Sequence, residues 1–261
     1  MTEPTILRSM KGPVGTLTIN RPQALNALDI DTLLAMEREL TALEADASVR
    51  VIVFTGAGDK AFIAGGDIAD LNSRQGLAHY LEFAEIVHRV FRRIEICDKP
   101  TLCAINGWAL GGGTELLLAT DIRIAADHAR LGLPEITLGL FPGAGGSQRL
   151  IRQVSPCKAK ELMFIGDRIT AAEALQLGLI NRVVEKERLI EETMAFAESI
   201  AEKSPLVLKL LKRTLANGAD MPLPAALAHE QAMIGLVLDT RDAHEGCAAF
   251  LEKRQPTFEG R

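Results

Sequence analysis

The chain has 261 residues, of which 48% are hydrophobic and 4% aromatic, and its formal net charge is −5. A chain of this length and apolar content can bury a large core, which excludes a mainly disordered protein. The acidic balance disfavours a nucleic-acid surface or binding to anionic membranes, and the few aromatic residues disfavour a base-stacking platform.

The four cysteines show no paired spacing of the kind that binds zinc or frames a disulfide-rich domain. We therefore expect reduced thiols, a cytoplasmic protein and no metal site. Residues 1–12 lack the basic-then-apolar order of a secretory signal. The longest uncharged run, residues 100–114, is interrupted by glycines and is too short to span a bilayer.

Alternating strands, glycine-rich loops and helices are predicted along the first 150 residues. The predicted strands are residues 5–9, 15–19, 49–55, 101–105 and 121–126. The predicted helices are a segment capped by Asp29 or Asp31 and ending near Ala47, then residues 76–96 and 115–119. The loops between them are residues 20–28, 56–67, 106–113 and 132–146. This order predicts the α/β class, with the glycine loops gathered at one end.

Strand signals fade after Ser155. Helices are expected at residues 156–165 and 170–177, with Gly178 as a stop, and a last short strand at 181–184. The four helices expected beyond it are residues 186–203, 205–217, 224–238 and 240–253. The composition changes near Ser204, so we divide the chain into residues 1–203 and 204–261.

Three common functional motifs are weak or absent. The chain has no GxSxG nucleophile elbow and no GxxxxGK[ST] phosphate loop. Residues 56–61 match GxGxxA after a strand, but no helix is expected directly after them, so a dinucleotide site is disfavoured.

Two glycine loops, residues 61–68 and 106–115, are more informative. Gly111, Gly112 and Gly113 immediately precede a short helix, where unpaired backbone amides carry the positive end of the helix dipole. Such a loop can hold a phosphate or a developing oxyanion. The alternative is that these glycines only allow a helix to pack closely on a strand.

Glu115 and Glu135 stand out among the carboxylates. Glu115 precedes the run Leu-Leu-Leu-Ala, and Glu135 lies between Pro134 and Ile136. Apolar surroundings raise a carboxyl pKa, which suits acid–base catalysis. The alternatives are a Glu that complements a helix dipole and a solvated loop charge.

Several motifs in order resemble those of the crotonase superfamily, and within it the enoyl-CoA hydratases. They are Asn20-Arg21-Pro22 with residues 24–28, residues 61–68, residues 106–115 with Asp121, residues 134–150, 166–183 and 245–254. The resemblance covers nearly the whole chain. It implies a spiral of ββα repeats over residues 1–203, a helical C-terminal region used in trimerisation over 204–261, and a homotrimer or homohexamer.

The resemblance also implies site residues and a reaction. The backbone amides of Gly66 and Gly112 correspond to the family's oxyanion hole. Glu115 would act mainly as base and Glu135 mainly as acid. The implied reaction adds water to a short-chain 2-enoyl-CoA and gives a 3-hydroxyacyl-CoA, within fatty-acid, amino-acid or aromatic-acid breakdown. Coenzyme A is then part of the substrate, and no cofactor is expected.

Further residues are implied to bind the acyl-CoA. Backbone atoms of Ala24, Leu25, Ala27, Phe62 and Ala64 would meet the adenine end. Other positions within the matching motifs are Asp67, Ile68, Gly111 and Gly143. Phe250 and Lys253 lie in the segment that reaches a neighbouring subunit's coenzyme A. Ala69 stands where some hydratases carry a lysine that contacts phosphate. The acyl pocket is expected between residues 71–91 and Leu140-Phe141.

Two alternatives remain at this point. An isomerase of the same superfamily needs only one base, typically at the position of Glu135, so the presence of both glutamates favours hydration. A non-catalytic RNA-binding relative would carry a lysine-rich helix. The net charge of −5 and the lack of a dense basic run disfavour that alternative.

Overall fold

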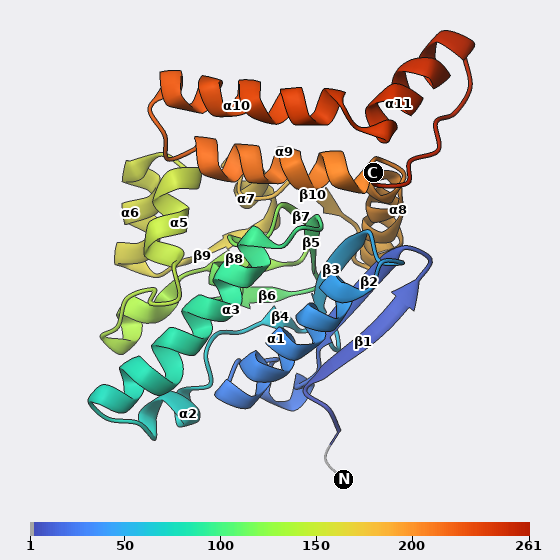
Figure 1. Ribbon diagram of the computed structural model, residues 1–261. Coiled ribbons are helices and arrows are strands. Elements are labelled where there is room, and N and C mark those ends of the chain that lie inside the picture. Colours follow the sequence, from blue (N-terminus) through green and yellow to red (C-terminus); the bar gives the residue numbers. More distant parts are fainter. Residues whose placement is uncertain (1–2) are drawn as a thin grey trace.

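The computed structural model describes residues 3–261, whose strands form two sheets (Figure 1). The larger sheet has the order β1-β2-β3-β5-β7-β10 and the smaller one the order β4-β6-β8-β9. The larger sheet consists of β1 (Ile6–Lys11), β2 (Val14–Ile19), β3 (Val51–Gly56), β5 (Thr101–Ile105), β7 (Ile122–Ala126) and β10 (Arg182–Val184). The smaller sheet consists of β4 (Ala61–Ile63), β6 (Trp108–Leu110), β8 (Arg130–Gly132) and β9 (Arg168–Thr170). Neighbouring strands are parallel except for β1 with β2 and β8 with β9.

Helices follow the strand pairs and cover the sheets. In the first half they are η1 (Pro22–Ala24), α1 (Ile30–Ala45), α2 (Ile68–Asn72), the π-helix η2 (His79–Ala84), α3 (Glu85–Ile96) and α4 (Gly112–Leu117). In the second half they are η3 (Pro134–Leu138), α5 (Gly146–Gln153), α6 (Pro156–Ile165), α7 (Ala171–Gln176), η4 (Lys186–Arg188), α8 (Leu189–Ala201), α9 (Pro205–Gly218), α10 (Leu223–Leu238) and α11 (Arg241–Glu252).

The chain moves between the two sheets in a repeating order. The pairs β3–β4, β5–β6 and β7–β8 each place one strand in the larger sheet and the next in the smaller sheet, and each pair is followed by helical segments. This is the predicted spiral of ββα repeats, and the α/β class and the crotonase-like fold are confirmed. The turns that leave β4, β6 and β8 therefore lie at one end of the smaller sheet.

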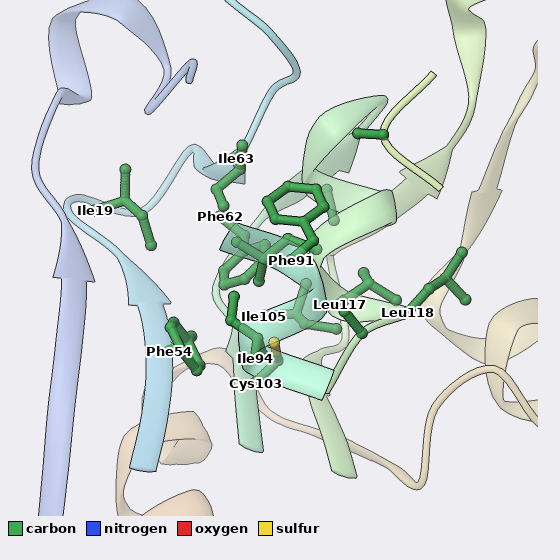
Figure 2. Packing of buried hydrophobic residues seen from close by; sticks show 14 of the residues in the cluster. Ile19, Phe54, Phe62, Ile63, Phe91, Ile94, Cys103, Ile105, Leu117 and Leu118 are labelled. Carbon is green, nitrogen blue, oxygen red and sulfur yellow. The ribbon is translucent and has the colours of Figure 1, made fainter. Parts of the chain in front are cut away.

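Both faces of the larger sheet are buried. Because side chains alternate along a strand, Ile52 and Phe54 of β3 join the core beneath α1 and α3, while Val51 and Val53 face α8. Figure 2 shows Phe54 with Phe62 and Phe91 in the first of these cores. The almost uninterrupted apolar run of β3 follows from its central place in a parallel sheet covered on two sides.

The structure differs from the expected elements in several places. The predicted glycine loops 56–67 and 106–113 contain the three-residue strands β4 and β6, which pair with each other. The predicted helix 76–96 is a π-helical turn, η2, followed by α3. Strands β8 and β9 were not expected either, and η3 lies within the predicted loop 132–146. The residues expected to end helices agree with the structure. The Asp29 side chain caps α1 by accepting from the Thr32 amide, and Gly178, the expected stop, adopts a positive φ.

The C-terminal helices lie along one side of the molecule, where α9 and α10 run side by side (Figure 1). The expected boundary at Ser204 coincides with the N-cap of α9, where the Ser204 hydroxyl accepts from the Val207 amide. No side chain of α9 or α10 is fully buried, although both helices are rich in leucine. Within residues 3–261, none of the helices combines the length and apolar character that a membrane crossing requires.

Candidate active site

A cavity of 390 Å³ lies where the glycine loops meet α3, η2 and η3. Its polar lining includes the two predicted carboxylates, Glu115 and Glu135, and the backbone of Gly66 and Gly112. The apolar lining comes mainly from Leu28, Ile68, Leu71, Phe83, Val87, Leu138, Leu140 and Phe141. The expected acyl pocket between residues 71–91 and Leu140-Phe141 thus coincides with this cavity.

The amides of Gly66 and Gly112 are close together and unengaged. A Cβ atom placed on Gly112 would lie 3.5 Å from the Gly66 nitrogen. Among the described residues, neither amide donates a hydrogen bond. Gly112 is the first residue of α4, and Gly111 before it has φ +49° and ψ −121°, a conformation that glycine adopts without a steric penalty. Two donors therefore remain for an oxygen atom in the cavity.

The second glycine loop also serves packing. A Cβ atom on Gly113 would lie 2.1 Å from the Ile63 carbonyl oxygen, so α4 approaches β4 more closely than any side chain allows. Thr114 holds the same region, because its hydroxyl donates to the Ala109 and Gly132 carbonyls at 2.6 and 2.9 Å. The two interpretations of this loop thus apply to neighbouring residues. Gly113 allows close packing on β4, whereas Gly112 has an amide without a partner among the described residues, as a ligand-binding loop requires.

The loop of residues 20–28 braces the first glycine loop. Leu28 donates to the Gly65 carbonyl at 2.9 Å and accepts from the Asp67 amide at 2.8 Å. Arg21 pairs with Asp67 and with Asp29, at 2.9 and 3.0 Å. These contacts hold the residues on both sides of Gly66 in place.

Asn26 fixes the conformation of that bracing loop. It has φ +58°, unusual for a residue with a side chain, and is 1% exposed. Its side-chain amide donates to the Ala57 and Ala61 carbonyls, at 3.0 and 2.8 Å, and its oxygen accepts from the Arg21 amide. Asparagine tolerates the left-handed region better than most residues, and these three hydrogen bonds hold it there.

Glu115 is 3% exposed and is held by backbone amides from a distant loop. Its Oε1 accepts from the Ala144 and Gly146 amides at 2.7 and 2.8 Å. Burial raises the pKa of Glu115, although these two bonds and the nearby Arg149 oppose the rise. No described residue donates a hydrogen bond to Oε2, the second oxygen of this cavity-lining carboxylate. Glu115 is therefore more than a charge placed to complement the dipole of α4.

Glu135 also lines the cavity, from η3. A Cβ atom on Gly111 would lie 3.1 Å from its Oε1, and its Oε2 is buried without a hydrogen-bond partner among the described residues. Burial raises the pKa of Glu135 to about 7, and the Glu115 charge adds to the rise. A solvated loop charge would show none of these features.

The other predicted binding residues fall into two groups. The cavity lining includes Ala64, Ile68, Gly111 and Gly143, whereas the remaining residues lie outside it. Phe62 is completely buried, and Asp67 pairs with Arg21. The amides of Ala24, Leu25 and Ala27 donate within their own loop, and their carbonyl oxygens accept from Ala27, Ala64 and Arg21. Phe250 is 83% exposed, near the end of α11, and Lys253 follows that helix.

Three residues at this site were missed by sequence reasoning. Ala144 and Gly146 donate to Glu115, and Arg149 donates to the Ala144 carbonyl at 3.2 Å. The run Gly143-Ala144-Gly145-Gly146 before α5 was a usable signal for exposed amides, but nothing in the sequence indicates that Glu115 is their acceptor. Among residues 3–261, no three His, Cys, Asp or Glu side chains are grouped to hold a metal ion.

The fold and this arrangement of loops are those of the crotonase superfamily. An enoyl-CoA hydratase structure from Bacillus anthracis superposes with a TM-score of 0.95 at 38% identity, covering 98% of this chain and 100% of that one. The profile of the enoyl-CoA hydratase/isomerase family matches residues 9–261, and the chain belongs to that family. The resemblance found in the sequence is thereby confirmed.

Two curated relatives are similar over nearly the whole chain. A protein named crotonyl-CoA hydratase from Syntrophomonas wolfei is 42% identical over 97% of this chain and 97% of its own length. A protein named short-chain-enoyl-CoA hydratase from Clostridium acetobutylicum is 41% identical over 96% of this chain and 95% of its own length.

Proposed function

We propose that this protein is an enoyl-CoA hydratase, which adds water across the α,β double bond of a short-chain 2-enoyl-CoA to form a 3-hydroxyacyl-CoA. The observation that carries the proposal is the joint lining of one cavity by two carboxylates and two unengaged amides. The names of relatives more than 40% identical over nearly the full chain support the same reaction.

The amides of Gly66 and Gly112 bind the thioester carbonyl oxygen in this mechanism. Withdrawal of electrons into that oxygen makes Cβ electrophilic and stabilises the enolate that forms when the water oxygen attacks. Because the donors are backbone groups fixed by β4, β6 and α4, little reorganisation is needed during the reaction.

The two glutamates divide the proton transfers. The Glu115 Oε2 accepts a proton from the water as the water oxygen bonds to Cβ, while Oε1 stays bound to the Ala144 and Gly146 amides. Glu135, with a pKa near 7, donates its proton to Cα. The sum is the addition of H and OH to the double bond, after which the proton on Glu115 returns to Glu135 through the next water.

The apolar wall provides the acyl site. Leu71, Phe83, Val87, Leu140 and Phe141 surround the cavity, which suits a short hydrocarbon chain. The loop of residues 24–27 and the backbone of Phe62 and Ala64 are proposed to meet the adenine end of coenzyme A. No cofactor is required, because coenzyme A belongs to the substrate.

Hydration of crotonyl-CoA, followed as the loss of absorbance of the conjugated thioester, tests the proposal. The purified protein should consume the substrate and release 3-hydroxybutyryl-CoA, identified by mass. A panel of longer enoyl-CoA thioesters then defines the chain length. A protein that binds these thioesters but hydrates none of them contradicts the proposal, and conversion of 3-enoyl-CoA alone would identify an isomerase instead.

We also propose a homotrimer or a hexamer of two trimers, in the cytoplasm. The exposed leucines of α9 and α10, such as Leu215 and Leu227, form an apolar surface that other copies of the chain would cover. Sedimentation velocity measures the assembly, and a monomer at micromolar concentration contradicts it. The absence of disulfides among Cys97, Cys103, Cys157 and Cys247 supports a reducing compartment.

A further inference from the structure

A partly buried arginine contacts the loop that holds Glu115. Arg149 lies on α5, one turn from its start, and its side chain is 13% exposed. Its Nε and Nη2 donate to the Glu95 carboxylate of α3 at 3.3 and 3.0 Å. Its Nη1 donates to the Ala144 carbonyl oxygen at 3.2 Å. The planar guanidinium therefore links α3, α5 and the loop of residues 143–146.

The carbonyl group that Arg149 contacts lies between the two amides that bind Glu115. These are the Ala144 and Gly146 amides, which both donate to Glu115 Oε1. The Ala144 carbonyl belongs to the peptide group between Ala144 and Gly145, so it lies between them along the chain. Gly145 has φ +103°, and a Cβ atom there would lie 2.1 Å from Arg149 Nη1. The guanidinium thus packs directly on the loop, and the loop conformation leaves room for it only because residue 145 is glycine.

The same guanidinium acts on the charge of Glu115. Burial raises the pKa of Glu115, and the positive charge of Arg149 is among the effects that oppose this rise. The other titratable groups around the cavity are Glu135 on η3 and His79 on η2. Glu95 balances part of the Arg149 charge from α3. Arg149 favours the ionised form of Glu115, the form that a base requires.

We propose that Arg149, anchored by Glu95, is a positioning residue that holds loop 143–146 so that its amides orient the Glu115 carboxylate toward the reacting water. This inference rests on the proposed hydratase function for its kinetic consequences. The effect of Arg149 on the loop conformation and on the charge of Glu115 does not depend on which reaction the site catalyses.

The kinetic test compares Arg149→Met with Arg152→Met. Arg152 lies one turn further along the same helix, is 59% exposed and donates to the Gln148 carbonyl, away from Glu115. Arg149→Met should lower kcat about 10- to 100-fold, because a small displacement of a catalytic group has a large effect on rate. The KM for crotonyl-CoA should change less than threefold, and Arg152→Met should behave as the wild type.

The pH profile separates positioning from a general loss of structure. Without the Arg149 charge the pKa of Glu115 rises further, so the acid limb of kcat/KM should move to higher pH in Arg149→Met. Arg149→Lys keeps the charge but cannot bridge Glu95 and Ala144 with one planar group. It should retain the wild-type acid limb with a partly reduced kcat. Glu95→Gln removes the anchor but keeps the Arg149 charge, so its kcat should also be partly reduced and its acid limb should not move to higher pH.

A crystal structure and a carbon-13 NMR titration of Glu115 test the inference without turnover. In Arg149→Met, loop 143–146 should move away from Glu115 and the carboxylate should titrate at higher pH than in wild type. An unmoved loop with an unshifted titration overturns the inference, as does an unchanged kcat and acid limb. If the wild type hydrates no enoyl-CoA, the proposed function fails, and these two measurements still decide the role of Arg149.

Discussion

The two sides of the cavity hold their carboxylates in opposite ways. On the α4 side, Glu115 is almost completely buried, and two amides from loop 143–146 bind one of its oxygens. On the η3 side, Glu135 is partly exposed and has an oxygen with no partner among the described residues. Burial raises the pKa of both carboxyls, but two hydrogen bonds oppose the rise at Glu115, which fits the proposed base at Glu115 and the proposed acid at Glu135. The same chemical group thus has different surroundings at the two positions.

Of the two carboxylates, Glu115 should affect the rate of hydration more when it is replaced. Glu115→Gln keeps the size of the side chain and removes the proton acceptor, so hydration of crotonyl-CoA should fall about 10³- to 10⁴-fold. Binding of a saturated acyl-CoA, measured by calorimetry, should be retained. Turnover within tenfold of wild type would contradict the assignment of Glu115 as base.

Replacing Glu135 should have a smaller effect on hydration. Glu135→Gln leaves water bound to Glu115 but removes the acid, and kcat should fall about 10²- to 10³-fold. Assaying both variants with a 3-enoyl-CoA sharpens the comparison, because an isomerase needs a base only at Glu135. Isomerase activity that survives Glu115→Gln and disappears in Glu135→Gln would show that the two sides have separable functions.

The oxyanion donors can be tested without changing a charge. In Gly112→Ala the new methyl group meets its neighbours at 3.5 Å or more, so folding should be normal. The methyl would nevertheless stand beside the Gly66 amide, and kcat should fall about 10- to 100-fold. Gly113→Ala is the contrasting variant, since a Cβ there collides with the Ile63 carbonyl and should destabilise the protein by several kcal/mol. Equal stability of the two variants in urea unfolding would refute this division.

The pH dependence of folding stability should show that ionising Glu135 in the folded protein is unfavourable. The folded-state pKa of Glu135 is raised from 4.5 to about 7, so stability is lost as the pH rises through that range. Glu135→Gln removes this loss and should raise Tm by about 2–4 °C at pH 8, with little change at pH 4. Calorimetry at the two pH values checks the sign, and an equal shift at both would show that ionisation is not the cause.

The smallest effect is expected at Gly66. Only its amide is proposed to act, and a Cβ there would meet the Leu71 Cδ1 at 3.2 Å, a contact that a side-chain adjustment can relieve. Gly66→Ala should therefore change kcat/KM less than about threefold, within the range of modest packing adjustments. A loss as large as that of Gly112→Ala would contradict the expectation that a methyl group is tolerated at Gly66.

Much of the fold was predictable because its signals are local. The buried strand β5 and the helix α6 have the expected bounds, since apolar runs and capping residues mark them within a few positions. The strands β4 and β6 were missed, because three residues carry little intrinsic preference and their pairing joins segments more than 40 residues apart. The π-helical start of the expected helix 76–96 likewise has no pattern of its own.

The candidate site shows the same difference between local and long-range signals. Sequence patterns identified which residues could act: glycines before a short helix, two glutamates among apolar residues, and the order of family motifs. Only the folded structure shows what each of them contacts. It separates Gly112 with an unengaged amide from Gly113 packed on Ile63, and it brings the Ala144 and Gly146 amides to Glu115. The physical reason is that hydrogen bonding and burial depend on neighbours that are distant in the chain, whereas sequence patterns report mainly on near ones.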